Sequence, residues 1–377
     1  MVETTWDRVA ALRLRRQRLD VPAPREAFLD VVRDHVGIQA QVMSSSELAL
    51  GARVAGLARD EVAHALWEER TLVKTWAMRG TLHLVAAQEL PELAAALGTR
   101  LNWTKPVWLR YFGVTAEQMR RLQDAIGEVL TDRPMTRVAL AEALAARLGD
   151  PSFAAKITGS WGTFLKPAAG RGLLCFGPGD GRNVTFVNPA AWLGCAIPDP
   201  DPAAFPAIVE RHLAAFPAAT RGELARWWGV APGELRAPLA ALGDRLAPVG
   251  VEGTTAYVRS VDLDGLAAAE PATTIRLLGG FDPYTLSLQK EAEPLLPLAR
   301  RALVSREAGW ISAVLLVGGR VAGTWTHDLS PRRTRIELSP WRRLTRAERR
   351  AVDAEAARIG AFLAPGVPLE LAIGDPG

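Results

Sequence analysis

The sequence predicts an α+β protein: tandem winged helix-turn-helix units followed by a small C-terminal β-rich, barrel-like domain. Two observations predict this fold. First, amphipathic helices followed by a β-hairpin occur three times along the 377 residues, without a fixed sequence period. Second, near residue 271 the chain changes to short apolar segments joined by glycine turns, which is typical of strands. A chain of this length exceeds one ordinary hydrophobic core, so several modules are expected.

The first winged-helix unit is predicted over residues 1–125. Ser44 and Glu47 have the spacing of a capping box, which predicts that a helix begins at Ser44. The segment "LVKTWAMRGTLHLV" (72–85) is apolar and β-branched around Arg-Gly, so it predicts a hairpin. The helices predicted before it from apolar periodicity are residues 24–37, 44–56 and 58–71.

The second unit (126–200) and the third unit (201–270) repeat this order. In the second, "LLCFGPGDGRNVTFV" has two apolar runs around a Gly/Asp-rich turn, which is a strong hairpin signal. A proline-rich segment, 197–206, reads as the linker between the two units. The expected elements are helices at 136–149 and 152–172 with a hairpin at 173–187, then helices at 220–229 and 231–244 with a hairpin at 246–260.

The remaining residues, 271–377, are predicted to form the β-rich domain. Short segments such as "VLLVGGRVAGTW" alternate apolar runs with glycine pairs. The amphipathic segment 345–364 is predicted to be the terminal helix.

Composition excludes several classes of protein. The N-terminus lacks the apolar run of a signal peptide, and no stretch reaches the length of a membrane-spanning helix. The two cysteines, Cys175 and Cys195, form no disulfide framework, and five scattered histidines give no zinc spacing. We therefore expect a cytoplasmic, nucleoid-associated protein with no membrane contact, no metal and no cofactor.

The positive charge is clustered. The net charge is +4, yet the segment 331–350 alone has eight Arg and two Glu, and the segment 13–18 has four Arg in six positions. Clusters of this kind are typical of a surface that contacts phosphate. The alternative is compositional drift, because the chain has 40 Arg and only five Lys.

The segment "GIQAQ" places Gln39 and Gln41 on either side of Ala40. Gly37 is expected to end one helix and Ser44 to begin the next, so residues 38–43 should be non-helical. In an extended segment, residues two apart share a face, so both amides would project to one side. The residues alone leave two readings open: the amides satisfy backbone groups at a helix junction, or they form a site.

Four segments taken in order resemble landmarks of the AlkZ-like winged-helix DNA glycosylase family. They are "GIQAQ", "LVKTWAMRGTLHLV", "IRLLGGFDPYTLSL" and "VLLVGGRVAGTW". The resemblance covers nearly the whole chain. It implies that Gln39-Ala40-Gln41 corresponds to the family's catalytic glutamine–apolar–glutamine motif. It further implies a monofunctional enzyme that hydrolyses the N-glycosidic bond of cationic or bulky N7- or N3-alkylpurine adducts, including those of interstrand crosslinks.

The expected partner is double-stranded DNA carrying alkylated purines, bound by a monomer. Lys74, Arg79 and His83 on the first predicted wing, and Arg332 and Arg333 in the basic segment, are expected to contact DNA. His83 alternates with leucines, so a buried histidine is an equal alternative.

Asp282 in "GGFDPYTL" is a candidate for bonding the catalytic loop, with a turn-forming Asp before Pro as the alternative. Two competing functions are a DNA-binding regulator without catalysis and a protein-interaction module with no DNA affinity.

Overall fold

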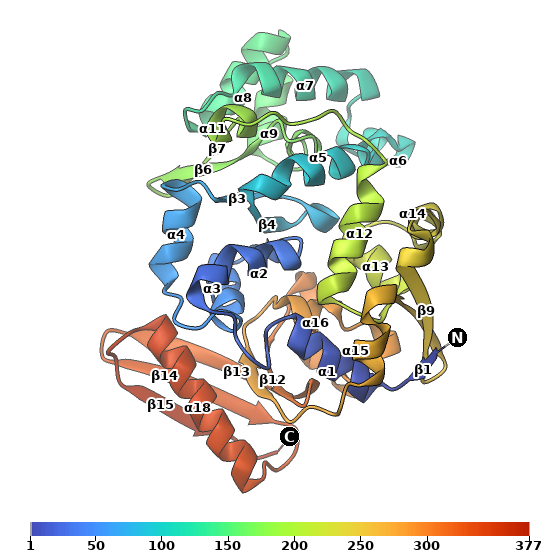
Figure 1. Ribbon diagram of the computed structural model, residues 1–377. Helices are drawn as coiled ribbons and strands as arrows, with labels where there is room; N and C mark the ends of the chain where they lie inside the picture. The colour runs from blue at the N-terminus through green and yellow to red at the C-terminus, as the bar shows by residue number, and fades with distance from the viewer. Residues whose placement is uncertain (1, 377) are drawn as a thin grey trace. The chain divides into compact units, whose positions relative to one another are not determined.

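The computed structural model describes residues 2–376 (Figure 1). The chain forms two compact units: unit 1 contains the residues up to 62 and those from 209 onward, and unit 2 contains residues 63–208. The segment predicted as the first winged-helix unit therefore contributes residues to both. The assignment of three winged-helix units, with boundaries after residues 125, 200 and 270, remains a prediction.

Unit 1 begins with strand β1 (Val2–Thr4) and helix α1 (Trp6–Arg16), which is capped by the side chain of Thr5. Helix α2 (Phe28–Asp34), strand β2 (Ile38–Gln39) and helix α3 (Met43–Gly51) follow. The expected capping box at Ser44 is wrong, because α3 begins at Met43 with Val42 at the N-cap and no side-chain cap.

Two sheets form in unit 1. The four-stranded sheet has the order β1-β9-β10-β8, with β9 at Leu246–Val251, β10 at Thr254–Arg259 and β8 at Ala219–Thr220. The predicted hairpin at 246–260 is therefore confirmed, and the N-terminal strand β1 extends it by pairing in parallel with β9.

The second sheet lies in the predicted β-rich region. Its order is β11-β12-β13-β14-β15, with β11 at Ile275–Leu278, β12 at Ala313–Val317, β13 at Arg320–Ser330, β14 at Arg333–Pro340 and β15 at Leu369–Ile373. Within residues 2–376 this sheet is open, with β11 and β15 as its edges, so the expected barrel-like closure is not found.

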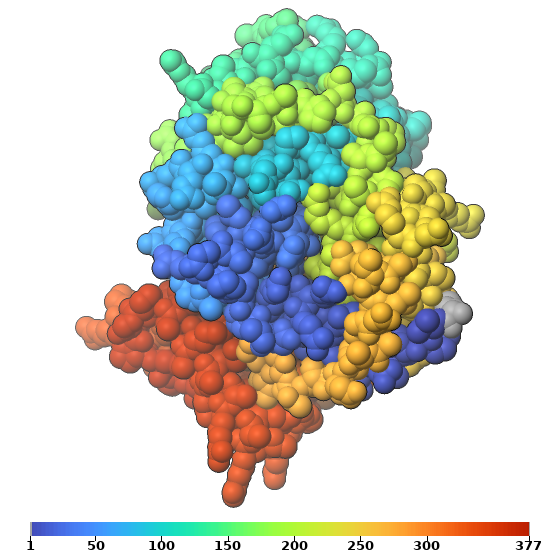
Figure 2. Space-filling view, in the orientation of Figure 1, coloured from blue at the N-terminus to red at the C-terminus, as the bar shows by residue number. Residues whose placement is uncertain are grey.

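Helix α18 (Arg346–Leu363) packs on the five-stranded sheet, as Figure 1 shows, and confirms the predicted terminal helix. Thr345 and Glu348 form a capping box that fixes its first turn. The helix buries Val352, Ala356 and Ile359 against the strands and leaves its arginine-rich face in solvent. Figure 2 shows the C-terminal segment that contains it in red.

The other helices of unit 1 are short. Helix α13 (Arg221–Trp228) has a Thr220–Glu223 capping box, and helix α16 (Pro283–Ser287) follows Asp282. Two helices, α4 (Arg59–Trp67) and α12 (Ala204–Ala215), contain the points where the chain passes from one unit to the other. The short helices are α13 (Arg221–Trp228), α14 (Arg236–Ala241), α15 (Leu263–Ala267), α16 (Pro283–Ser287) and α17 (Arg301–Val304).

Unit 2 contains the first two predicted hairpins. Strands β3 (Leu72–Trp76) and β4 (Leu82–Ala86) pair antiparallel, and so do β6 (Cys175–Asp180) and β7 (Asn183–Val187), with β5 (Met135–Thr136) beside β7. The helices of this unit are α5 (Leu90–Gly98), α6 (Pro106–Phe112), α7 (Ala116–Val129), α8 (Arg137–Leu148), α9 (Ser152–Thr158), α10 (Lys166–Gly170) and α11 (Pro189–Leu193).

The helix predicted at 152–172 is interrupted. Only α9 and α10 are helical, and Gly162 between them has a φ of 80°. A Cβ atom at Gly162 would lie 2.4 Å from the indole of Trp76, so glycine lets the loop approach this ring.

No helix among residues 2–376 combines the length and the apolarity needed to cross a bilayer.

Candidate functional site

The two glutamines lie in a short non-helical connection between α2 and α3, as the sequence predicted. Helix α2 ends at Asp34, and Val36 and Gly37 have positive φ values of 57° and 106°, which turn the chain out of the helix. Strand β2 then includes Gln39, and Val42 is still extended before α3 begins. Gln39 is 7% exposed and Ala40 is fully buried, whereas Gln41 is exposed to solvent. The two amides therefore differ in access to solvent.

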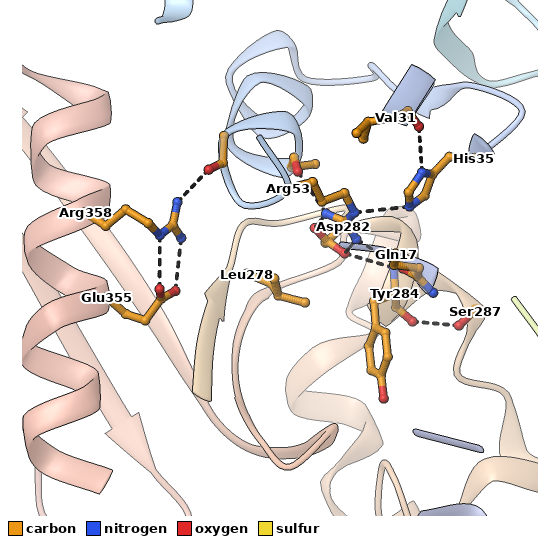
Figure 3. Close-up of polar contacts among 12 residues, drawn as sticks. Gln17, Val31, His35, Arg53, Leu278, Asp282, Tyr284, Ser287, Glu355 and Arg358 are labelled. Atoms are coloured by element: carbon orange, nitrogen blue, oxygen red, sulfur yellow. Dashed lines mark hydrogen bonds and ion pairs between the residues drawn. The ribbon is translucent and has the colours of Figure 1, made fainter. Parts of the chain in front are cut away.

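A fully buried arginine braces the helices on both sides of this connection (Figure 3). Arg53 lies one residue beyond the C-cap of α3, and all five of its N–H donors have acceptors. The acceptors are His35 Nε2 at 3.1 Å, the Ala49 carbonyl at 2.9 Å, Gln17 Oε1 at 3.2 Å and the two carboxylate oxygens of Asp282, each at 2.8 Å.

These partners come from four different elements of unit 1. Gln17 is the C-cap of α1, His35 is the C-cap of α2, Ala49 lies in the last turns of α3, and Asp282 is the N-cap of α16. Because His35 lies at the end of α2 and Ala49 lies within α3, Arg53 links the two helices that flank the glutamine segment.

The hydrogen bonds define the tautomer of His35. Its Nδ1 lies 2.8 Å from the Val31 carbonyl, which can only accept, so Nδ1 carries the proton and Nε2 accepts from Arg53. Burial, with a further contribution from Arg53, lowers the pKa of His35 to about 3. The ring is therefore neutral at physiological pH, as its acceptor role requires.

Asp282 caps a helix, as one of the two readings of the sequence expected, and it also pairs with Arg53. It accepts a hydrogen bond from the Tyr284 backbone N–H at 2.9 Å, so it caps α16 as a turn-forming Asp before Pro. It also accepts two hydrogen bonds from Arg53, which joins it to the helices that flank the glutamine segment. No local pattern in the sequence marks Arg53 or His35 as part of this network, because the Asp282–Arg53 pair joins positions 229 residues apart.

A second arginine supports the end of α3. Arg358 of α18 donates to the Gly51 carbonyl at 2.8 Å and is held by Glu355 on its own helix, as Figure 3 shows. A cation at a helix C-terminus satisfies a carbonyl that has no partner within the helix.

The predicted residues of the first wing are in different environments. Lys74 on β3 is half-buried, with its Nζ 5.7 Å from the Phe176 ring, and burial lowers its pKa. Arg79 lies in the turn after β3 with a positive φ of 57°. His83 is 3% exposed and its Nδ1 lies 3.0 Å from the Thr81 carbonyl; burial lowers its pKa to about 3. His83 is therefore a buried histidine, the alternative that the sequence left open, and its contact with DNA remains a prediction.

The basic segment 331–350 forms the turn of a long hairpin and the start of α18. Arg332 is exposed in the two-residue turn between β13 and β14, where Ser330 pairs with Arg333. Arg333 makes an exposed ion pair with Glu370 at 3.0 Å. Five exposed arginines of this segment form no ion pair within residues 2–376: Arg332, Arg343, Arg346, Arg349 and Arg350.

The other arginine cluster, 13–18, is not a continuous phosphate-binding surface. Arg13 is fully buried and donates to Glu223 and to the Pro217 and Ala218 carbonyls. Arg16 is paired with Asp262. These arginines stabilise the packing of α1, which the local sequence could not distinguish from a surface cluster.

Comparisons with known proteins identify the family of this chain. Residues 32–362 match the family model described as DNA glycosylase AlkZ-like. The chain is 36% identical over 364 residues to an interstrand DNA cross-link repair glycosylase of Streptomyces sahachiroi, aligning 95% of this chain and 96% of that protein. It superimposes on the solved structure of Streptomyces sahachiroi DNA glycosylase AlkZ with a TM-score of 0.88 at 35% identity, covering 98% of this chain and all of that one. The chain therefore belongs to the AlkZ-like family of DNA glycosylases, hydrolases that act on N-glycosyl bonds.

Proposed function

We propose that this DNA glycosylase removes cationic or bulky purine adducts alkylated at N7 or N3, including those that join two strands, and that Gln39 and Gln41 position the attacking water. The observation that carries the proposal is the Gln39-Ala40-Gln41 connection, which has an exposed amide and lies between two helices that Arg53 links. The similarity to a protein named for interstrand crosslink repair supports the class of substrate.

A glutamine amide is not a general base at neutral pH, but it accepts and donates hydrogen bonds. Two amides can orient a water molecule toward the anomeric carbon, and a well-oriented nucleophile lowers the barrier without a proton acceptor of its own. The amide oxygens also place partial negative charge beside a sugar that becomes positively charged in the transition state.

This chemistry suits a leaving group that is already cationic. As the C1′–N9 bond of an N7-alkylguanine breaks, both bonding electrons go to the purine and neutralise its positive charge. The water oxygen forms the new bond to C1′, and the water then releases a proton to solvent. No lysine nucleophile enters the reaction, so the product is an intact abasic site and the enzyme is monofunctional.

The rigid bracing of the segment is part of the proposal. An amide that positions water must be fixed to within a fraction of an ångström, and the buried Arg53–Asp282 pair restricts the two helices that flank the glutamines. We therefore assign Arg53 and Asp282 as positioning residues rather than catalytic ones.

In this proposal, electrostatic attraction between arginine side chains and phosphates holds the DNA. The exposed arginines of the 331–350 segment, Arg332 first among them, contact backbone phosphates and give affinity that depends little on sequence. The enzyme acts as a monomer on duplex DNA.

Single-turnover release of N7-methylguanine from a duplex tests the assignment. Gln39→Ala and Gln41→Ala should each slow release by roughly tenfold to a thousandfold with DNA affinity nearly unchanged, as for loss of one positioned group. Because Gln39 is buried and Gln41 exposed, only Gln39→Ala should also lower stability, by about 1–3 kcal/mol.

Two other glutamines supply matched controls. Gln123 is 1% exposed and donates to the Met119 carbonyl, so Gln123→Ala should destabilise the fold without slowing release. Gln88 is exposed, so Gln88→Ala should change neither property. A Gln39→Ala, Gln41→Ala protein that is destabilised yet fully active at temperatures where it stays folded would exclude the catalytic assignment and leave a structural role for the pair.

A further inference from the structure

Unit 2 contains a cationic pocket that neither the glutamines nor the basic segment accounts for. Its volume is about 290 Å³, at the low end of small-molecule sites, which span about 300–1,000 Å³. It is lined by the turn between β3 and β4, the end of α5, the start of α6 and the first turn of α10. The residues that matter to the argument are Trp76, Arg79, Arg100, Trp103, Trp108 and Lys166.

The charged side chains that line this pocket are all cationic. Arg79, Arg100 and Lys166 line it, and no aspartate or glutamate does. Lys166 is half-buried, makes no ion pair within the described chain, and has its pKa lowered by burial. Burying an ammonium group without a carboxylate costs free energy that an anionic ligand recovers on binding.

The turn that carries Arg79 has an unfavourable backbone conformation for its side chain. Arg79 has a φ of 57° and a ψ of 6°, a left-handed conformation that glycine or asparagine adopts at lower cost. The Lys166 side chain lies next to this turn: a Cβ atom added to Gly80 would be 3.5 Å from the lysine Cδ. Strained non-glycine residues of this kind concentrate at binding sites.

The walls of the pocket are aromatic and fixed in place. Trp76 and Trp103 are 6% and 9% exposed and belong to the core of unit 2. Trp108 is half-buried, with its ring centroid 4.5 Å from that of Phe112 and 6.1 Å from that of Phe164. A flat, immobilised indole next to cations is suited to stack on a nucleobase whose phosphate binds the cations.

We propose that this pocket binds a single unstacked nucleotide of a DNA strand, with its phosphate on Lys166, Arg79 and Arg100 and its base against Trp108. The small volume accommodates one nucleotide rather than a strand segment. The proposal goes beyond removal of the damaged base, since the site uses neither Gln39 nor Gln41 and requires no lesion.

Equilibrium binding of undamaged single-stranded oligonucleotides to the full chain tests this site. The probes are fluorescent oligothymidylate and an oligomer of the same length made of abasic deoxyribose phosphate. Lys166→Gln should weaken binding of oligothymidylate roughly tenfold to a hundredfold, the loss of about one charge-assisted contact. Lys156→Gln is the matched control, since Lys156 has the same charge in the same unit but does not line the pocket, and it should change affinity less than twofold.

A second variant separates base stacking from phosphate binding. Trp108→Ala should weaken oligothymidylate at least fivefold, the lower bound for loss of stacking on one base, and leave the abasic oligomer nearly unchanged. Thymidine monophosphate should compete for the site better than inorganic phosphate.

Three results would overturn the proposal: equal effects of Lys166→Gln and Lys156→Gln, equal loss of both oligomers in Trp108→Ala, or equal competition by phosphate and by thymidine monophosphate. Excision of N7-methylguanine is measured separately, so a failure of this site is distinguishable from a failure of the glutamine mechanism.

Discussion

Replacing Asp282 with asparagine tests whether the Arg53 network holds the catalytic segment. In the native protein both carboxylate oxygens accept from Arg53 at 2.8 Å, and neither side chain has any exposed surface. Asparagine has nearly the same shape and can still cap α16 through its carbonyl. It removes the negative charge and places an NH₂ group opposite one guanidinium N–H.

The expected loss is large because the remaining charge is completely buried. Removing one partner of a buried ion pair costs about 3–5 kcal/mol, since the other ion is left in a medium of low polarity without compensation. Stabilities of native domains are about 5–15 kcal/mol, so this single change should remove a substantial fraction of the total. Arg53 retains its bonds to His35, Gln17 and Ala49, which places the expected value at the lower end, about 3 kcal/mol.

Urea unfolding measures this loss, and hydrogen–deuterium exchange locates it. Exchange in Asp282→Asn should increase in α2, α3 and α16 and stay unchanged in α7 of unit 2. Glu117→Gln is the control, because it breaks an exposed pair with Arg120 and should cost less than about 1 kcal/mol. A loss below about 1 kcal/mol for Asp282→Asn would refute the claim that Arg53 depends on this carboxylate.

Two further predictions concern DNA affinity and pH. Arg332→Ala should reduce the slope of log K against log[salt] by about 1, whereas Arg333→Ala should change it less because Glu370 already pairs with Arg333; equal slopes for the wild type and Arg332→Ala would move the phosphate surface elsewhere. The pKa of His83 is about 3 in the folded protein and near 6.5 when unfolded, so the unfolded chain takes up a proton first as the pH falls through 6.5. The contribution of neutral His83 to the free energy of unfolding should therefore be fully present above pH 6.5. It should decrease toward pH 3 by about 1.4 kcal/mol per pH unit. His83→Asn keeps a donor for the Thr81 carbonyl and should flatten the decrease between pH 6 and 4 in urea titrations; an unchanged profile would assign the acid sensitivity to other groups, such as His35.

Elements that depend on neighbouring residues were predictable from the sequence. The hairpin around "GPGDGR" and the helix at 346–363 are specified by turn residues and by apolar periodicity, and the structure has both. The non-helical Gln39-Ala40-Gln41 connection was predictable too, because Gly37, with its positive φ, lies just after one helix and a few residues before the next. The predicted start of that next helix was wrong by one residue, since the helix begins at Met43 without a side-chain cap.

The burial and the partners of charged side chains could not be predicted from the sequence. Arg13, Arg53 and Arg332 are chemically identical, yet the first two are fully buried and the third is exposed in a turn. Their roles depend on partners far along the chain, Glu223 for Arg13 and Asp282 for Arg53, which no local pattern encodes. His83 is buried for the same reason, because β4 packs into the core of unit 2.

The sequence by itself therefore determined the order of helices and hairpins, the family and the glutamine motif, all of which reside in short stretches of neighbouring residues. Only the tertiary structure decided which cations are buried, which amide reaches solvent, and that Arg53 braces the motif while Lys166 lines a pocket. Those properties arise from the burial and pairing of residues that are distant in sequence, and local periodicity carries no information about such contacts.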